Sequence, residues 1–374
     1  MSPFKVNAPR NAPAVPPNDV DTDVLVRRSG ALGRITLNRP QAINALTLEM
    51  VRQIHVGLDA FEADPAIRVV LLDGAGERGL CAGGDIVALH DDVKAGSDAP
   101  REFWTEEYVL DARIANFPKP FVSIMDGIVM GGGIGLAGHA SHRLATERLV
   151  SAMPEVGIGF APDVGGTWLF TRTPGQLGTH LALTGARIGA HDAIAAGLAD
   201  RIVASAAVPQ LVEDLAAGAL HDALERAQSV PVDVPDGELG PARPWIADAY
   251  AHDTIEEILD ALDARPEAGA AKAAKAIRRA SPTSVKVTLR ALHAARKLPN
   301  LEAALQQELR ISCGFLVAGD FVEGVRAQVI DKDRNPQWNP ETLAGVQSSV
   351  VNRFFISLGE HDLHFPIAEQ ADAR

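Results

Sequence analysis

The chain has 374 residues, 47% hydrophobic and 22% charged, a composition typical of a globular protein. Its formal net charge of −13 argues against a nucleic-acid-binding protein, which would carry a basic excess or stripe. An anionic small ligand is compatible with this charge, because a local basic cluster or backbone N–H groups can hold it. The sequence contains no run of about eighteen apolar residues, so we expect no membrane span and no membrane partner.

The N-terminal segment 1–21 is rich in proline and poor in apolar residues, which predicts a disordered tail. It lacks the apolar core of a secretory signal peptide, and a transit peptide has only weak support because no Arg-rich amphipathic pattern is present. The two cysteines, Cys81 and Cys313, lie far apart, so they indicate neither a disulfide framework nor a zinc site. These features favour a cytoplasmic location.

Strand and helix patterns alternate from residue 22 to about residue 207. Strand signals at 24–28 and 34–37 flank a turn at Ser29 and Gly30, which predicts a hairpin. Thr47 is placed to cap an amphipathic helix. The run "IRVVLLDGAG" (67–76) then predicts a strand covered on both faces. This alternation, with further short strands at 142–147 and 149–153, predicts an α/β core over 22–207.

From residue 208 to residue 374 the pattern predicts helices and loops. Four prolines at 229–244 indicate a linker or an ordered loop. Amphipathic helices are predicted at 254–262, 281–292 and 301–316, the second of them capped by Ser281. We therefore expect three parts: a tail, an α/β core and a helical C-terminal region.

Two glycine-rich turns, "CAGGD" (81–85) and "MGGGIG" (130–135), each follow a buried strand and open a helix. Glycine lets the backbone approach a ligand closely with its N–H groups bare. Two such groups directed at one oxygen would form an oxyanion hole, which the positive end of a helix would strengthen. The alternative is that these glycines only allow tight packing.

Three other signals are weak. The segment "GIGLAG" (133–138), with Glu155 about twenty residues later, matches a dinucleotide-binding fingerprint, but the following helix is too short and the acid lies in a turn. His139 and His142 lack a completing carboxylate or cysteine pattern, so no metal site is expected. Cys81 has no evident base nearby in the sequence and is predicted to be a buried packing residue.

The stretch "MPEVGIGFAPDVGG" (153–166) carries two acids, Glu155 and Asp163, among small and apolar residues. An ionised carboxylate buried without partners costs several kcal/mol, roughly. Both acids must therefore reach water or a partner, or serve chemistry.

These motifs, together with "LNRPQAINAL" (37–46), resemble the crotonase (enoyl-CoA hydratase/isomerase) superfamily in order and spacing. "LALTGARI", "SPTSVKVTLR", "DFVEGVRAQVIDKDRNPQW" and "NRFFISLGEHDL" narrow the likeness to the 3-hydroxyisobutyryl-CoA hydrolase branch. The likeness spans about residues 24–365. It implies a spiral of ββα units followed by helices, and possible trimers or hexamers.

The resemblance also implies roles for particular residues. Gly84 and Gly132 would supply the oxyanion-hole amides, Glu155 the catalytic acid, and Asp163 a second catalytic acid lining the site. Glu107, in "TEEY", would bind substrate. The rest of the first glycine turn would line the substrate site as well: Ala82, Gly83 and Asp85.

Two departures from the hydratases bear on the reaction. Gly135 stands where hydratases place a second catalytic Glu, so addition of water across a double bond is disfavoured. Gln41 replaces a Lys that directs positive charge at coenzyme A. The implied activity is hydrolysis of a short 3-hydroxyacyl-CoA in valine breakdown, with coenzyme A as part of the substrate and no separate cofactor. A hydratase or isomerase using Glu155 alone, and a non-catalytic acyl-CoA-binding protein, are the alternatives.

Overall fold

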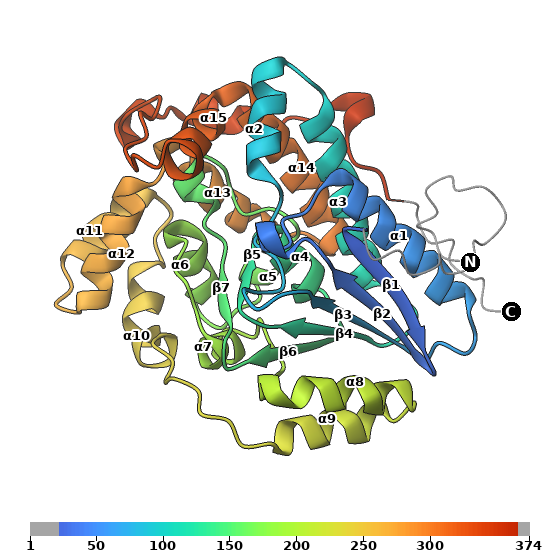
Figure 1. Cartoon of the computed structure of the whole chain (residues 1–374). Coiled ribbons are helices and arrows are strands. Elements are labelled where there is room, and N and C mark those ends of the chain that lie inside the picture. The colour runs from blue at the N-terminus through green and yellow to red at the C-terminus, as the bar shows by residue number, and fades with distance from the viewer. Residues whose placement is uncertain (1–21, 366–374) are drawn as a thin grey trace, which may run out of the picture.

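The computed structural model describes residues 22–365, so the disorder predicted for 1–21 lies outside the described residues. Six strands form one sheet in the order β1-β2-β3-β4-β6-β8, in which β1 and β2 are antiparallel and the other pairs are parallel (Figure 1). The smaller β5 and β7 pair in parallel. The strands are β1 (Val24–Ser29), β2 (Leu32–Leu37), β3 (Val69–Gly74), β4 (Phe121–Met125), β5 (Ile128–Met130), β6 (His142–Thr146), β7 (Val150–Ala152) and β8 (Arg201–Val203).

The predicted hairpin and the strand within 67–76 are confirmed as β1, β2 and β3. The first five residues of β3 are buried because the sheet is covered on both sides. Helices α8 (Val208–Ala216) and α9 (Leu220–Ser229) cover the lower face in Figure 1, where Leu211, Leu215 and Leu224 pack on strand side chains. β8 was not predicted, since its three residues are too short for a sequence pattern.

The helices of the α/β core lie mainly on the other face. Thr47 caps the first of them as predicted, because its side chain accepts a hydrogen bond from the Met50 N–H. The helices are α1 (Leu48–Ala63), α2 (Ile86–Ala95), α3 (Ala99–Ala115), α4 (Gly132–Gly138), α5 (Gly166–Phe170), α6 (Leu177–Thr184) and α7 (Ala190–Ala195), with the short turns η1 (Pro40–Ala42), η2 (Glu155–Ile158) and η3 (Ser205–Ala207).

The region after residue 208 is helical, and among its described residues it contains no strand. The three predicted helices are confirmed as α11, α13 and α14, and Ser281 caps α13 through its side chain. After α8 and α9, the elements of this region are α10 (Leu239–Ala249), α11 (Ile255–Asp263), α12 (Ala268–Arg279), α13 (Pro282–Ala295), α14 (Leu301–Ala318), α15 (Asp320–Val325), η4 (Arg326–Ile330), η5 (Leu343–Gly345), α16 (Ser348–Arg353) and η6 (Gly359–His361).

The predicted linker at 229–244 is wrong in its second part, where α10 begins at Leu239 and contains Pro244. The buried Asp192 carboxylate of α7 accepts hydrogen bonds from the Glu238 and Leu239 N–H groups. It satisfies donors that a helix start leaves free, and it comes from an element far away in sequence. The helix therefore depends on a tertiary contact that a local pattern does not contain.

One continuous cluster of buried apolar side chains runs through both the α/β core and the C-terminal helices. Helix α14 packs along α3, and α15 packs on both α2 and η2. The helical region therefore covers the part of the core that carries Glu155. The division between residues 207 and 208 stays a prediction.

Candidate active site

The two glycine turns lie side by side and present free amides. A Cβ built on Gly132 would stand 3.5 Å from the Gly84 nitrogen, so the two turns nearly touch. Gly83 and Gly131 have φ values of 105° and 48°, which glycine adopts without a Cβ penalty. Within residues 22–365 neither the Gly84 N–H nor the Gly132 N–H donates a hydrogen bond. Two adjacent unused amides of this kind can stabilise a developing oxyanion.

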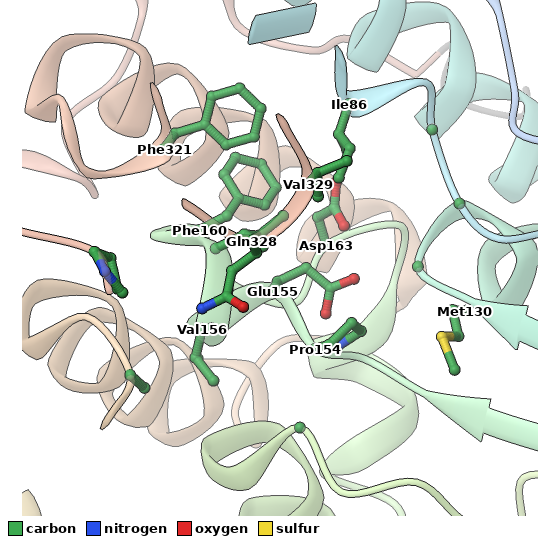
Figure 2. A pocket seen from close by; sticks show the side chains of 18 of the residues that line it. Ile86, Met130, Pro154, Glu155, Val156, Phe160, Asp163, Phe321, Gln328 and Val329 are labelled. Atoms are coloured by element: carbon green, nitrogen blue, oxygen red, sulfur yellow. The ribbon is translucent and has the colours of Figure 1, made fainter. Parts of the chain in front are cut away.

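These turns open onto a cavity of about 700 Å³. Its lining includes Ala82, Gly83, Gly84 and Gly132 from the turns and Glu107, Glu155 and Asp163 from the predicted acids. Figure 2 shows Glu155 and Asp163 with their carboxylates inside this cavity. The structure thus brings together seven residues that the sequence analysis placed in the site.

Glu155 opens the η2 turn, which follows β7 and Pro154. Its side chain is 6% exposed, and a Cβ on Gly131 would stand 3.0 Å from its Oε1. The Oε2 atom has no hydrogen-bond partner among the described residues. The carboxylate therefore faces the amide turns and is free to act on a molecule bound there.

Asp163 lies on a tight turn that is held from several sides. Val164 has a φ of 50°, an outlier for a β-branched residue, and such strain persists only where the surroundings enforce it. His139 Nε2 donates to the Val164 carbonyl at 2.8 Å. Glu308 of α14 accepts from the Gly165 N–H at 2.6 Å and from the Thr167 N–H at 2.9 Å. The C-terminal region therefore fixes the turn that carries Asp163.

Two further acids stand behind the amide turns on α3. Glu107 and Asp111 are one helical turn apart, so both project from the same face. A Cβ on Gly132 would stand 2.4 Å from Glu107 Oε1, which places this carboxyl directly against the turn. Glu107 Oε1 and both Asp111 oxygens are buried without a partner among the described residues.

Burial shifts the titration of these acids toward neutral pH. It raises the pKa of Asp163 to about 7, although the hydrogen bond from the Tyr108 hydroxyl at 2.8 Å lowers it in part. Burial raises the pKa of Glu155 well above its ordinary value, and the Asp163 charge raises it further. The same two causes raise the pKa of Glu107. A carboxyl with a pKa near 7, such as that of Asp163, suits proton transfer near neutral pH.

The structure places Asp85 outside the cavity, contrary to its predicted role in substrate binding. Its carboxylate accepts the Ala88 N–H at 3.3 Å, which caps α2. It also pairs with Arg39 at 2.8 Å. Because the residue is the N-cap of α2, its side chain turns back onto that helix and away from the cavity.

Gly135 has no room for a side chain. A Cβ at this position would stand 2.7 Å from Val164 Cβ and 2.8 Å from Asp111 Oδ1. A glutamate there would collide with both residues. The absence of a second acid at 135 is therefore part of the packing of this cavity.

Several residues around the acids were missed by the sequence analysis. Tyr108 holds Asp163 and lies 2.8 Å from the Ser312 hydroxyl, and Glu308 holds the turn. The spacing of Glu107 and Asp111 on one helix face was a usable signal. No sequence signal pointed to Ser312 and Glu308, because they lie almost 150 residues away from the stretch around Asp163 that they support.

The lining of the cavity contains two kinds of surface. Buried apolar side chains form one of them: Leu89, Phe103, Trp104, Phe160 and Phe321. Four exposed arginines from the outer loops and helices form the other: Arg187, Arg278, Arg279 and Arg334. Of these, Arg278 pairs with Asp263, and within the described chain the other three have no ion-pair partner.

Residues 22–365 contain no cluster of three or more His, Cys, Asp or Glu side chains arranged to hold a metal ion. In the same part of the chain no helix is both long and apolar enough to cross a bilayer. Cys81 is buried, as the sequence predicted, and burial raises the pKa of its thiol to about 12.

Comparison with known proteins gives the family. The enoyl-CoA hydratase/isomerase profile matches residues 32–355. The chain is 39% identical over 350 residues to the mitochondrial 3-hydroxyisobutyryl-CoA hydrolase of Danio rerio, with 91% of each chain covered. It is 40% identical to the enzyme of the same name from Rattus norvegicus, covering 92% of this chain and 91% of the relative.

Two solved structures match almost the whole fold. One is a carnitinyl-CoA dehydratase from Mycobacterium thermoresistibile, with a TM-score of 0.88, 45% identity, and 93% of this chain and 100% of that chain covered. Another is an enoyl-CoA hydratase from Rhodobacter sphaeroides 2.4.1, with a TM-score of 0.86, 42% identity, and 92% and 100% covered. The predicted α/β fold with a helical C-terminal region is confirmed.

The expected cytoplasmic location is contradicted, because the curated relatives are named as mitochondrial enzymes. That expectation rested on two unpaired cysteines and on the weak transit-peptide pattern in 1–21. Free thiols report a reducing environment and do not distinguish one such compartment from another. From the profile match, the near-complete relatives and the shared architecture, we conclude that the chain belongs to the enoyl-CoA hydratase/isomerase family, the crotonase superfamily.

Proposed function

We propose that this protein hydrolyses the thioester of a short 3-hydroxyacyl-coenzyme A, with 3-hydroxyisobutyryl-CoA from valine breakdown as its substrate. The observation that carries the proposal is the approach of the Glu155 carboxylate to the turns that hold the free amides of Gly84 and Gly132. The names of the curated relatives support this choice of substrate.

The thioester oxygen would accept hydrogen bonds from the Gly84 and Gly132 amides. Removal of one such donor costs about 3–4 kcal/mol of transition-state stabilisation in a comparable site. Glu155 then acts in one of two ways. It attacks the carbonyl carbon, expels the coenzyme A thiolate and leaves a mixed anhydride for water to open, or it takes a proton from a water that attacks directly. Both routes give the hydroxy acid and coenzyme A.

Glu107 and Asp163 would position the substrate hydroxyl or the attacking water. Both line the cavity beside Glu155, and burial raises the pKa of both. With a pKa of about 7, Asp163 can donate a hydrogen bond when protonated and accept one when ionised. Substrate-hydroxyl recognition by buried acids would favour a 3-hydroxyacyl group over a plain acyl group, because the plain acyl group would leave these polar groups unpaired.

Coenzyme A would bind through its phosphates to the exposed arginines that line the cavity. Its phosphates need positive charge, and Arg187, Arg279 and Arg334 offer guanidinium groups that no carboxylate of the described chain neutralises. These arginines would supply the charge that Gln41 does not. A trimer or hexamer stays a prediction.

A hydratase or isomerase is the second candidate, favoured by the names of the two similar proteins of known structure, a dehydratase and a hydratase. Against it stands Gly135, where Asp111 and Val164 occupy the space that a second acid would need. A non-catalytic acyl-CoA-binding protein is a third alternative, and the unpartnered Glu155 beside free amides weighs against it.

One assay separates the three. Thiol release is followed over a panel of acyl-CoA esters, and loss of conjugated absorbance is followed with crotonyl-CoA. We expect the fastest thiol release from 3-hydroxyisobutyryl-CoA and no comparable change with crotonyl-CoA. Faster consumption of crotonyl-CoA would make the protein a hydratase, and tight binding without thiol release would make it a binding protein.

A further inference from the structure

We propose that Trp104, Phe160 and Phe321 form a closed aromatic wall that limits the length of the acyl chain the protein accepts. We call these three side chains the aromatic wall. The inference rests on the proposed thioesterase function and adds to it the residues that would set acyl-chain specificity, one of which comes from the C-terminal region.

The contrast between exposed charge and buried apolar surface sets the direction of the substrate. The arginines are exposed, so a polyanionic coenzyme gains charge partners there and stays hydrated. The aromatic rings are buried, and Trp104 lies one helical turn before Glu107 on α3. An acyl chain bound between Gly84 and Gly132 therefore extends from the carbonyl toward the aromatic wall, because apolar groups gain free energy on burial there.

The three rings of the wall contact one another closely. Trp104 stacks on Phe160 with ring centroids 5.1 Å apart, and Phe160 lies 5.5 Å from Phe321. Phe321 meets Trp104 edge-on at 6.3 Å. All three side chains are buried and line the cavity, and Figure 2 shows Phe160 and Phe321 beside each other. Mutual contact leaves no gap between the rings for a chain to pass.

The wall is held in place by backbone contacts between α15 and the η2 turn. A Cβ on Gly159 would stand 2.1 Å from the Asp320 carbonyl oxygen, and one on Gly324 would stand 2.3 Å from the Ile158 carbonyl carbon. The two segments therefore pack backbone against backbone. Phe321 lies on α15 and Phe160 follows η2, so this backbone contact holds the two Cα atoms that carry the rings close together.

A buried hydrogen-bond chain secures the same contact. The Ser281 hydroxyl donates to Asp320 Oδ2 at 2.5 Å, and the Ser281 N–H donates to the Val156 carbonyl at 3.1 Å. The Asn339 N–H also donates to Asp320 Oδ1 at 3.0 Å. The residue before Phe321 is thereby tied to the turn that begins with Glu155. A longer acyl chain would have to displace a ring from a packed and anchored position.

The test compares Phe321→Ala and the milder Phe321→Leu with the matched controls Phe354→Ala and Phe354→Leu. Phe354 is a buried ring that packs on Phe315 at 4.6 Å and does not line the cavity. The readout is the ratio of kcat/KM for hexanoyl-CoA to that for butyryl-CoA within each variant. This ratio does not depend on the fraction of the protein that folds.

We expect the ratio to rise about fourfold in Phe321→Leu and more than about tenfold in Phe321→Ala, because each methylene newly accommodated contributes roughly a factor of four. The Phe354 variants should keep the wild-type ratio. An unchanged ratio in both Phe321 variants, or an equal change in the Phe354 variants, would overturn the proposal.

A binding experiment keeps this inference separate from the proposed function. Butyryl-CoA and hexanoyl-CoA are titrated into Glu155→Gln, with and without Phe321→Ala, and their affinities are measured by calorimetry. If the wild-type protein hydrolyses no acyl-CoA, but the ratio of the two affinities changes with Phe321→Ala, the aromatic wall is supported and the thioesterase assignment is wrong. If the wild-type protein hydrolyses acyl-CoA, but Phe321→Ala changes neither the kcat/KM ratio nor the affinity ratio, the thioesterase assignment is supported and the aromatic wall is wrong.

Discussion

The two sides of the cavity come from different parts of the chain and contribute different kinds of residues. The α/β core supplies the amide turns and the acids Glu107, Glu155 and Asp163, which are the groups that can make and break bonds. The helical C-terminal region supplies one ring of the aromatic wall and three of the four arginines that line the cavity. In the proposals above, the core side reacts with the substrate and the C-terminal side contributes to its selection.

The difference also appears in how the two sides are stabilised. The core side keeps buried carboxyl oxygens without partners, an arrangement that costs free energy unless the groups are protonated or bound to substrate. The C-terminal side is closely packed, and its buried polar groups Ser281 and Asp320 are hydrogen-bonded to each other. Four of the carboxyl oxygens left unpartnered among the described residues, on Glu107, Asp111 and Glu155, thus lie where chemistry is proposed.

The largest expected effect tests the core side. Glu155→Gln keeps the shape of the side chain but removes both the nucleophile and the base. We expect thioesterase kcat to fall by about 10²–10⁴-fold, the usual contribution of a positioned acid or base. Thiol release under saturating acyl-CoA measures it.

The control for this variant is Glu213→Gln on the exposed surface of α8, which should keep wild-type turnover. Circular dichroism and thermal unfolding check that both variants fold. Near-normal turnover in a folded Glu155→Gln protein would remove Glu155 from the mechanism, and the comparison between the two sides would lose its basis.

The second prediction concerns how the buried Asp163 changes the free energy of unfolding with pH. The pKa of Asp163 is about 7 in the folded protein, above its ordinary value of 3.8. Between these pH values the unfolded chain has already released this proton while the folded chain keeps it. The free energy of unfolding therefore falls as pH rises from about 4 to about 7, by about 4 kcal/mol for this one group.

Asp163→Asn mimics the protonated acid at every pH and removes this dependence. Denaturant unfolding of both proteins at pH 5 and pH 8 measures it, with the variant gaining stability relative to the wild type at the higher pH. The same substitution should slow thioester hydrolysis. A difference between the two proteins that does not change with pH would contradict the assigned titration.

The smallest expected effect tests the arginines that line the cavity. Arg187→Gln and Arg279→Gln should each raise KM for an acyl-CoA by about three- to tenfold and leave kcat nearly unchanged, because exposed ion pairs contribute about 1 kcal/mol. The increase should shrink at high salt, where screening weakens the wild-type attraction.

Arg353→Gln is the matched control, an exposed arginine on α16 that does not line the cavity. It should keep the wild-type KM at all salt concentrations. A KM that responds equally in all three variants would show a general charge effect, and the proposed position of the coenzyme phosphates would be wrong.

Local signals were sufficient for much of the core. The Thr47 cap and the continuous apolar run of β3 are patterns within a few residues, so the sequence predicted their elements correctly. The glycine turns and the acids Glu155 and Asp163 were found for the same reason, whereas Glu107 was implied by the family resemblance. Helix α10 was assigned in part to a linker because its start is capped by Asp192 from α7, a contact across about 46 residues. Asp85 was misplaced because its capping role depends on where its side chain turns.

By itself, the sequence determined which residues have chemical capacity: bare amides at the glycine turns, two acids in an apolar stretch, and a family motif order that spans the chain. The tertiary structure alone decided how they meet. It placed Glu155 against the amide turns, put Asp111 where a side chain at 135 would stand, and brought Glu308 and Phe321 to the site from more than 140 residues away. Such contacts depend on packing between distant segments, which no local pattern of residues encodes.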